Sequence, residues 1–204
     1  MASGTPGAGG CTSSLMAVRW TITISIANIV EGFYMNFLMA TPLKMSSITD
    51  PTRMGAKVDK WTLRFLSMAQ SVARWSKDPS TRVGAVLVSP DRRIVIPGYN
   101  GLPRGIEDST DRLLNREWKL RTILHAEHNA ILTARQDVSG WTMYVTHHPC
   151  SNCSAVMVQS GIGAVHYIRD NAFEDKWRCS LETAGILFKE AGVHVEGHRL
   201  WMGA

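Results

Sequence analysis

The sequence HAEHNAILTARQDVSGWTMYVTHHPCSNCSAVMVQ, residues 125–159, decides the fold and carries most of the chemistry. Its hydrophobic pattern predicts a helix over His125–Gln136, a strand over Trp141–His147 and a helix over Cys150–Gln159. The segments HAE and PCSNC therefore begin two helices that flank one strand. We expect the rest of the chain to support, cover or extend this unit.

The flanking sequence predicts further helices and strands. A helix over Val58–Lys77 ends at Asp78, and strands over Arg82–Ser89 and Arg93–Tyr99 follow as a hairpin. The polar stretch Asn100–Thr122 is a long loop. Other expected elements are a short helix over Arg112–Leu120, strands over Ala164–Ile168 and Val193–Glu196, and a helix over Trp177–Ala191. This alternation predicts an α/β sandwich whose hairpin is antiparallel and whose crossover-linked strands are parallel.

The first predicted helix has one apolar face. Its members recur at spacings of three and four residues, which places that face against a core. They are Trp61, Phe65, Met68, Val72 and Trp75.

Residues 1–56 differ in composition from residues 57–204, and we expect an N-terminal extension before a single domain. The apolar stretch Leu15–Leu43 is interrupted by Arg19 and Glu31, so neither uncharged piece approaches the ~20 residues that span a bilayer. A secretory signal fits poorly, because the tail before the apolar stretch is long and uncharged.

The extension contains little catalytic chemistry, so we interpret it as poorly ordered or non-essential. A membrane or targeting role is the alternative. Met45 or Met54 could serve as the biological start. Deleting residues 1–53 should leave activity intact, and complete loss of activity in a folded product would contradict this interpretation.

The composition is that of an ordinary globular chain. The 204 residues are 45% hydrophobic and 19% charged, enough for one domain with a substantial core. Four cysteines, two of them in a Cys-x-x-Cys motif, favour a metal and a reducing, cytoplasmic location over a disulfide framework. The net charge of +5 and the pI near 9.2 permit an anionic substrate, although a mildly basic solvated surface explains them equally well.

His125, Cys150 and Cys153 are candidate zinc ligands. A catalytic zinc has three protein ligands and keeps one position open, and helix N-termini help cysteines to ionise. Glu127 lies two residues from the histidine, close to the metal but free to move protons. His-x-Glu followed by Pro-Cys-x-x-Cys is the signature of zinc-dependent nucleobase deaminases, whereas a lone Cys-x-x-Cys could be redox-active or structural.

Residues 60–204 resemble the cytidine deaminase superfamily, and within it the deoxycytidylate (dCMP) deaminases. Beyond the two zinc motifs, the resemblance rests on KDPSTRVGAV at 77–86, GYNGLPRG at 98–105, NAI at 129–131 and MYVT at 143–146. The second of these segments favours dCMP deaminases over other members. The resemblance implies a three-layer α/β/α sandwich around a five-stranded mixed sheet.

The implied reaction is the hydrolytic deamination of dCMP to dUMP and ammonia, which feeds thymidylate synthesis. An activated water would attack the 4-position carbon of cytosine, while Glu127 protonates ring nitrogen 3 and then the departing amino group. Members of the family are commonly hexamers activated by dCTP and inhibited by dTTP, and a dimer is the alternative for this chain. A loop compatible with such control contains Gly98, Tyr99, Asn100, Gly101 and Gly105.

The resemblance assigns a nucleoside contact to Asn100, whose alternative role is a turn cap. It also places Phe173 near the base, with core packing as the alternative. The 5'-phosphate calls for cations or backbone amides, and no spacing selects among four basic residues that could equally be solvated surface charges. These candidates are Lys77, Arg82, Arg104 and Arg121.

Some phage-type relatives bind a second, structural zinc through Cys and His in the long insert. Neither residue type occurs in Asn100–Leu124, so we expect one Zn²⁺ per chain. His147 and His148 are expected to support the loop before the second motif. We interpret the remaining cysteines and histidines as structural or incidental, namely Cys11, Cys179, His128, His166, His194 and His198.

Two alternatives stay open. One is another deaminase of the superfamily, acting on modified dCMP, a free nucleoside or base, or tRNA adenosine, with unchanged zinc chemistry. The other is a zinc-stabilised binding module, against which Glu127 argues because a structural site needs no free carboxylate. No basic stripe typical of nucleic-acid tracking is present, so we expect a small-molecule nucleotide partner, and neither nucleic acid nor membrane.

Overall fold

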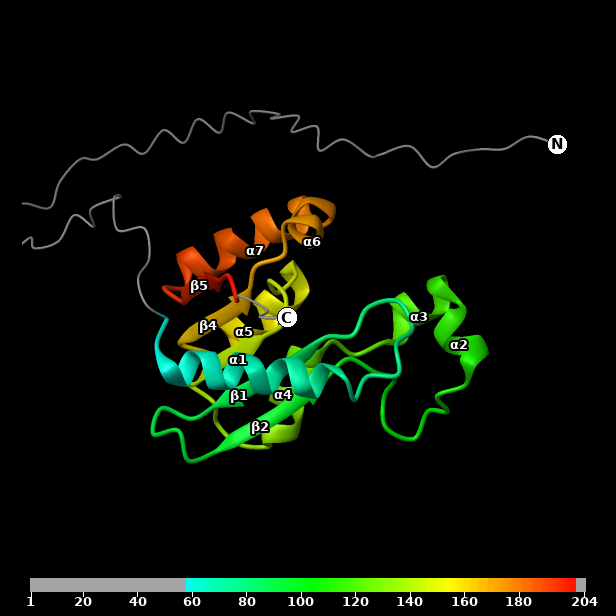
Figure 1. Cartoon of the computed structure of the whole chain (residues 1–204), viewed down its shortest axis with the longest axis horizontal. Helices are drawn as coiled ribbons and strands as arrows, with labels where there is room; N and C mark the ends of the chain where they lie inside the picture. Colours follow the sequence, from blue (N-terminus) through cyan, green and yellow to red (C-terminus); the bar gives the residue numbers. More distant parts are fainter. Residues whose placement is uncertain (1–57, 201–204) are drawn as a thin grey trace, which may run out of the picture. The chain divides into compact units, whose positions relative to one another are not determined.

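A five-stranded mixed sheet forms the centre of the structure, a computed structural model that describes residues 58–200 (Figure 1). The strands are β1 (Gly84–Val88), β2 (Val95–Tyr99), β3 (Thr142–Val145), β4 (Ala164–Ile168) and β5 (His194–His198). They lie in the order β2-β1-β3-β4-β5. β1 pairs antiparallel with β2 and β3, whereas β3, β4 and β5 run parallel. The predicted antiparallel hairpin and parallel crossover strands are confirmed.

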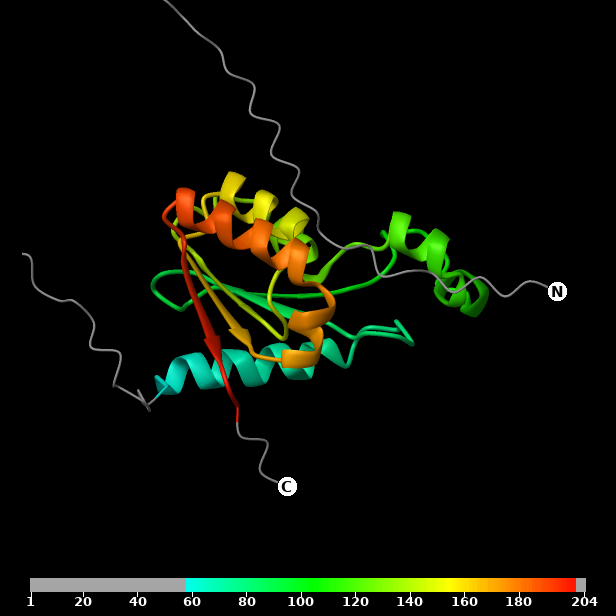
Figure 2. The same cartoon turned by 90° about the horizontal axis from the view of Figure 1, so that it is seen from above.

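Helices cover both faces of this sheet and complete the predicted three-layer α/β/α sandwich (Figure 2). The layers contain α1 (Lys60–Ala73) on one face and α4 (Ala126–Ala134), α5 (Ser151–Gln159) and α7 (Arg178–Glu190) on the other. Successive side chains of a strand point to opposite faces. Val86 therefore packs toward α1, while Ala85 and Leu87 pack toward α4, α5 and α7.

The buried face of α1 differs from the predicted one. Phe65 and Val72 are buried as expected, but Met68 is 42% exposed and Trp75 is 56% exposed. The physical reason is the close approach of β1, where a Cβ on Gly84 would collide with the carbonyl oxygen of Ala69. Small residues must face the strand there, which turns Met68 outward. The helix also ends before Trp75.

The long insert contains two short helices where the sequence predicted one. These are α2 (Thr110–Leu114) and α3 (Arg116–Thr122), separated by Asn115 in an extended conformation. The Asn115 side chain accepts a hydrogen bond from the Trp118 amide at 3.1 Å and so begins a new helix. A further helix, α6 (Asn171–Lys176), was not predicted, because its six residues are too few to show a period.

The predicted extension lies outside the described residues, as do Met45, Met54 and Cys11. The boundary after residue 56 therefore stays a prediction. Within residues 58–200, no helix combines the length and apolarity that a membrane crossing requires.

Candidate active site

The two sequence motifs meet at the starts of α4 and α5. His125 is the N-cap residue of α4 and Cys150 is the N-cap residue of α5, with Cys153 in the first turn of α5. The Nδ1 atom of His125 lies 3.5 Å from the Cys150 Sγ and 3.2 Å from the Cys153 Sγ. Segments about two dozen residues apart in the chain thus converge on one point, as their chemistry predicted.

The start of α4 is positioned by its close packing on β2. A Cβ on Gly98 would collide with the Ala126 carbonyl oxygen and lie 2.6 Å from the Ala130 nitrogen. The Asn129 side-chain amide also donates to the Tyr99 carbonyl oxygen at 2.6 Å. The helix can therefore approach the strand only where glycine stands, and this approach brings His125 to the edge of the sheet.

The donor atoms fit a zinc ion. A tetrahedral zinc with Zn–N of about 2.0–2.1 Å and Zn–S of about 2.3 Å holds nitrogen and sulfur donors about 3.5 Å apart. The separations of 3.5 and 3.2 Å observed for His125 agree with that value. These three residues form one of two groups in the described chain whose donor atoms converge within 4.8 Å.

The pKa values of the two cysteines and His125 are shifted mainly by hydrogen bonds among them and by burial. A hydrogen bond from Cys153 lowers the pKa of Cys150 to about 3, despite its burial. The same hydrogen bond, together with burial, raises the pKa of Cys153. The hydrogen bond with Cys150 raises the pKa of His125. A bound divalent cation would displace the remaining protons, because it is held by thiolates and a neutral imidazole.

Glu127 lies beside the three donors in the first turn of α4, where it is only 4% exposed. Burial is the largest effect on this carboxyl and raises its pKa, while the positive charge of His125 lowers it to a smaller extent. A buried carboxyl with a raised pKa holds a proton more readily than an exposed one, and such carboxyls serve as general acids and bases. Glu127 is therefore suited to general acid–base chemistry.

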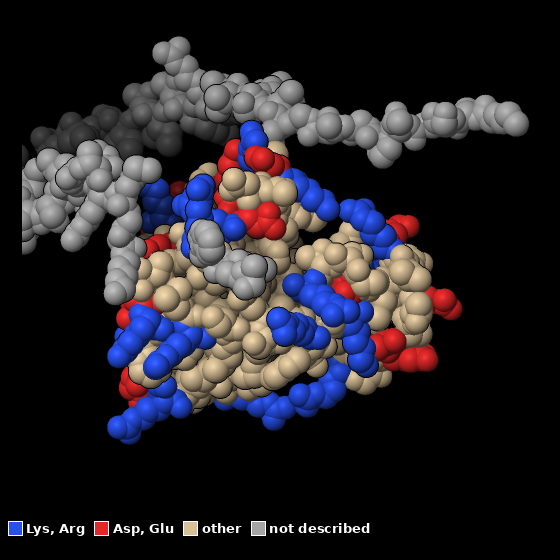
Figure 3. Space-filling model, viewed as in Figure 1, with Lys and Arg blue, Asp and Glu red and all other residues tan. Residues whose placement is uncertain are grey.

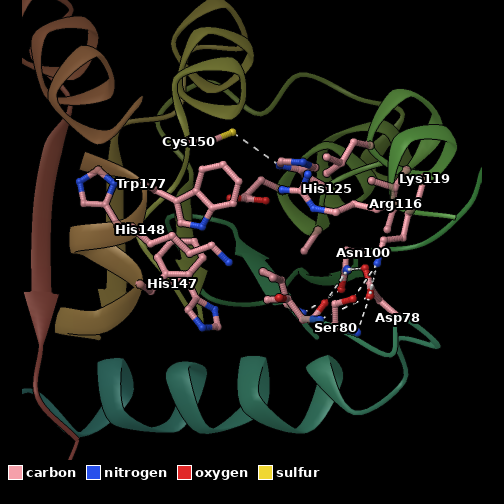
Figure 4. Close-up of a pocket in the computed structure, with 18 of the residues that line it drawn as sticks. Asp78, Ser80, Asn100, Arg116, Lys119, His125, His147, His148, Cys150 and Trp177 are labelled. Carbon is pink, nitrogen blue, oxygen red and sulfur yellow. Dashed lines mark hydrogen bonds and ion pairs between the residues drawn. The ribbon is translucent and has the colours of Figure 1, made fainter. Parts of the chain in front are cut away.

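These groups open into a cavity of about 400 Å³, a size suited to a small-molecule ligand. Figure 4 shows two different walls. One is mainly aromatic and is formed by His147, His148, Phe173 and Trp177. The other is polar and includes Asp78, Ser80, Asn100, Arg116 and Lys119. The Phe173 ring packs 4.6 Å from the His147 ring, so Phe173 lines the cavity rather than the interior of the core.

Asn100 lines the cavity, but its side chain holds the surrounding loop together. Its Oδ1 accepts from the Val83 amide at 2.8 Å, and its Nδ2 donates to the Thr81 carbonyl oxygen at 2.9 Å. Next to it, Gly101 and Leu124 form an isolated antiparallel bridge that anchors the segment before His125. The nucleoside contact of Asn100 stays a prediction, and the cap-like role has direct support in these hydrogen bonds.

The four cations predicted to bind phosphate do not line this cavity. Lys77 forms an exposed ion pair with Asp108 at 2.8 Å, and Arg121 forms one with Glu117 at 2.6 Å. Arg82 and Arg104 are exposed. Figure 3 shows the basic side chains of one face in separate groups rather than in a single stripe.

Three other cations line the cavity, and sequence reasoning missed them: Arg116, Lys119 and Lys176. Lys119 is buried and pairs with Asp78 at 2.8 Å while also donating to Ser80 at 3.0 Å. Arg116 forms no ion pair with another residue of the range 58–200. The sequence does not show how the insert folds. In the structure, α3 brings residues more than thirty positions beyond Asp78 into contact with it.

Comparison with known proteins agrees with this geometry. The family model of the cytidine and deoxycytidylate deaminase zinc-binding region matches residues 59–169, more than half of the chain. A deaminase of Aliivibrio fischeri, uncharacterized and encoded in the luxG 3' region, is 45% identical over 139 residues, which are 68% of this chain and 93% of the relative.

Deoxycytidylate deaminase of Mus musculus is 42% identical over 144 residues, covering 66% of this chain and 77% of the mouse protein. The crystal structure of dCMP deaminase from the cyanophage S-TIM5 in apo form superposes with a TM-score of 0.53 at 25% identity, covering 68% of this chain and 97% of that one. The chain described here belongs to the cytidine and deoxycytidylate deaminase family and has that family's zinc-binding region.

Proposed function

We propose that this chain is a zinc-dependent hydrolase that converts dCMP to dUMP and ammonia. The observation that carries the proposal is the convergence of His125, Cys150 and Cys153 beside the buried carboxyl of Glu127, at the base of a cavity. Similarity to deoxycytidylate deaminases of mouse and human supports the choice of substrate.

The ligands and Glu127 have separate roles in this reaction. His125, Cys150 and Cys153 would hold the zinc, and the bound ion would supply an activated water because a divalent ion lowers the pKa of water. Glu127 takes the proton released from the water and delivers it to ring nitrogen 3 of cytosine. Glu127 then takes the remaining proton from the oxygen now bonded to C4 and passes it to the exocyclic amino group, so that the C4–N bond breaks, ammonia leaves and the carbonyl of dUMP forms. The raised pKa of Glu127 suits both transfers.

The cavity walls support a pyrimidine nucleotide. Aromatic rings such as Phe173 and Trp177 provide a surface for a flat base. Among the cations of the cavity, Lys119 is already neutralised by Asp78 and Lys176 lies over the Trp177 ring, whereas Arg116 has neither kind of partner in the described chain. We therefore place the 5'-phosphate near Arg116, whose guanidinium can bind phosphate through two parallel hydrogen bonds.

The deciding experiment measures ammonia release from dCMP, CMP, deoxycytidine, modified dCMP and a tRNA anticodon stem-loop. We expect dCMP to have the highest kcat/KM. A preference for a free nucleoside or for the RNA would replace this proposal with another deaminase of the family. Zinc binding without turnover of any substrate would favour the binding module instead.

A homo-oligomer in the cytoplasm, a hexamer rather than a dimer, completes the proposal. Its support is the outer surface of the α4/α5/α7 layer, where Leu132 is 63% exposed and Ile186 is 57% exposed. Free thiols at Cys150 and Cys153 suit a reducing compartment. Activation by dCTP and inhibition by dTTP are proposed on the resemblance alone. Light scattering after gel filtration, with and without each nucleotide, measures the assembly directly.

A further inference from the structure

A second group of potential metal ligands lies on β4 and β5, far from the first in sequence. His194, Glu196 and His198 alternate along β5, so all three side chains point to the same face of the sheet. On the neighbouring strand, His166 is the register partner of Glu196. One carboxylate and three imidazoles therefore share a small area at the edge of the sheet, since β5 is its last strand.

The side chains converge at distances that an ion would bridge. The Glu196 carboxylate lies 3.7 Å from His166 Nδ1, 3.6 Å from His194 Nε2 and 3.9 Å from His198 Nδ1. These separations exceed the 2.7–3.2 Å of a hydrogen bond, yet they are near the ~3.4 Å between donors around a tetrahedral ion. Only His166 and His198 touch directly, with Nδ1 2.9 Å from Nε2.

The surroundings hold the buried imidazoles in place. His198 is 3% exposed and His166 is 14% exposed. His166 is also held in orientation, because its ring stacks on Tyr144 at 5.1 Å and 14°. Arg169 is the nearby unfavourable charge, but it packs against Gly197, whose Cβ position points to the opposite face of β5.

We propose that His166, His198 and Glu196 form a binding site for a divalent transition-metal ion of the Zn²⁺ class, with His194 as a fourth donor. Two imidazoles and a carboxylate are a ligand set that zinc accepts. Such an ion ties the edge strand β5 to β4. The site does not depend on the proposed deaminase activity, and it gives a second zinc per chain where the sequence predicted one.

Zinc stoichiometry of the full-length protein tests this site. In equilibrium dialysis against low-micromolar free ZnCl₂, the wild-type chain should bind two equivalents. The double variant His194→Ala/Glu196→Gln should bind one, because it loses both exposed donors and keeps the buried histidine pair. These side chains are 66% and 51% exposed, so folding should tolerate the change. Glu190→Gln, an exposed change of the same kind on α7, should still bind two.

Cobalt(II) distinguishes the two sites spectroscopically, because thiolate ligands give an intense near-ultraviolet charge-transfer band and imidazole ligands do not. We expect one equivalent with that band and one without it, and only the second should disappear in the double variant. A single equivalent in the wild-type chain, or two in the double variant, would overturn the proposal. Either result would leave the deaminase assignment untouched, since that rests on the thiolate site.

Discussion

The two histidine-containing clusters within residues 58–200 differ in what surrounds them. At the first, His125 and the two cysteines lie at helix starts, His125 and Cys150 line a cavity of about 400 Å³, and the buried carboxyl of Glu127 is beside them. At the second, His166, Glu196 and His198 lie on adjacent strands. None of these three residues lines the cavity.

This difference separates a catalytic site from a structural one. A catalytic metal needs an open position, space for a substrate and a group that moves protons. The first cluster has space for a substrate and a group that moves protons, and its three donors leave one coordination position open. The second has imidazole and carboxylate donors, none of which lines the cavity beside Glu127, so we expect an ion there to stabilise the fold. Ligand type alone would not have distinguished them.

Metal removal should have the largest effect and should separate the clusters completely. A chelator that strips all zinc should abolish deaminase activity. On titration with Zn²⁺, the first equivalent should restore activity, because thiolates bind this ion more tightly than a carboxylate and imidazoles do. The second equivalent should raise only the melting temperature. Activity that appears with the second equivalent would reverse the roles assigned to the two clusters.

Two glutamate substitutions make the same comparison without touching the metal content of the first site. Glu127→Gln should keep that zinc and lower kcat by about 10²–10⁴-fold, because the proton carrier is gone. Glu196→Gln should leave kcat unchanged. Steady-state kinetics with dCMP, alongside zinc analysis, provide the readout. Near-normal turnover in Glu127→Gln would contradict the assignment of Glu127 as the general acid and base.

The first cluster could be predicted from the sequence, because its donor residues lie in two short motifs at helix starts. The sequence was insufficient for the second, although the alternation His194-x-Glu196-x-His198 was a signal for one face of a strand. What was lacking was the strand register, which alone places His166 opposite Glu196.

The same limit applies elsewhere in the chain. Periodicity predicted the five strands and the principal helices, because each buries a regular pattern. Periodicity predicted the wrong buried face for α1, because the need for a small side chain at Ala69 comes from the close approach of Gly84 on β1. No spacing in the sequence selected among the candidate phosphate-binding cations, because Lys119 reaches Asp78 only through the fold of the insert.

The polar wall of the first site should depend strongly on the buried pair of Asp78 and Lys119, each about 6% exposed in its side chain. Lys119→Met should lower the free energy of unfolding by about 3–5 kcal/mol, because it leaves a buried carboxylate without its partner. The double variant Asp78→Asn/Lys119→Met should recover part of that loss. Urea denaturation measures all of these values.

Lys77→Met is the matched control, since the Lys77–Asp108 pair is largely exposed to solvent. It should unfold at the same urea concentration as the wild type. Equal losses for Lys77→Met and Lys119→Met would mean that burial does not govern these pairs, and that Lys119 does not organise the wall of the cavity.

Two glycine substitutions, one at each cluster, should give the smallest effects. A Cβ at Gly98 meets backbone atoms of α4, at Ala126 and Ala130, which cannot move without shifting His125. Gly98→Ala should therefore cost about 1–3 kcal/mol and also weaken zinc binding at the first site. The atoms nearest to a Cβ at Gly197 belong to the Tyr167 and Arg169 side chains, 2.6 to 2.7 Å away, and not to the backbone.

Because such side-chain ends can move aside, Gly197→Ala should cost less than Gly98→Ala and should leave activity unchanged. Thermal unfolding together with zinc analysis of both variants measures the difference. If both substitutions proved equally mild, α4 would not be fixed by its contact with β2. Gly98 would then have to be explained by the proposed response to nucleotides, because packing would no longer require a glycine there.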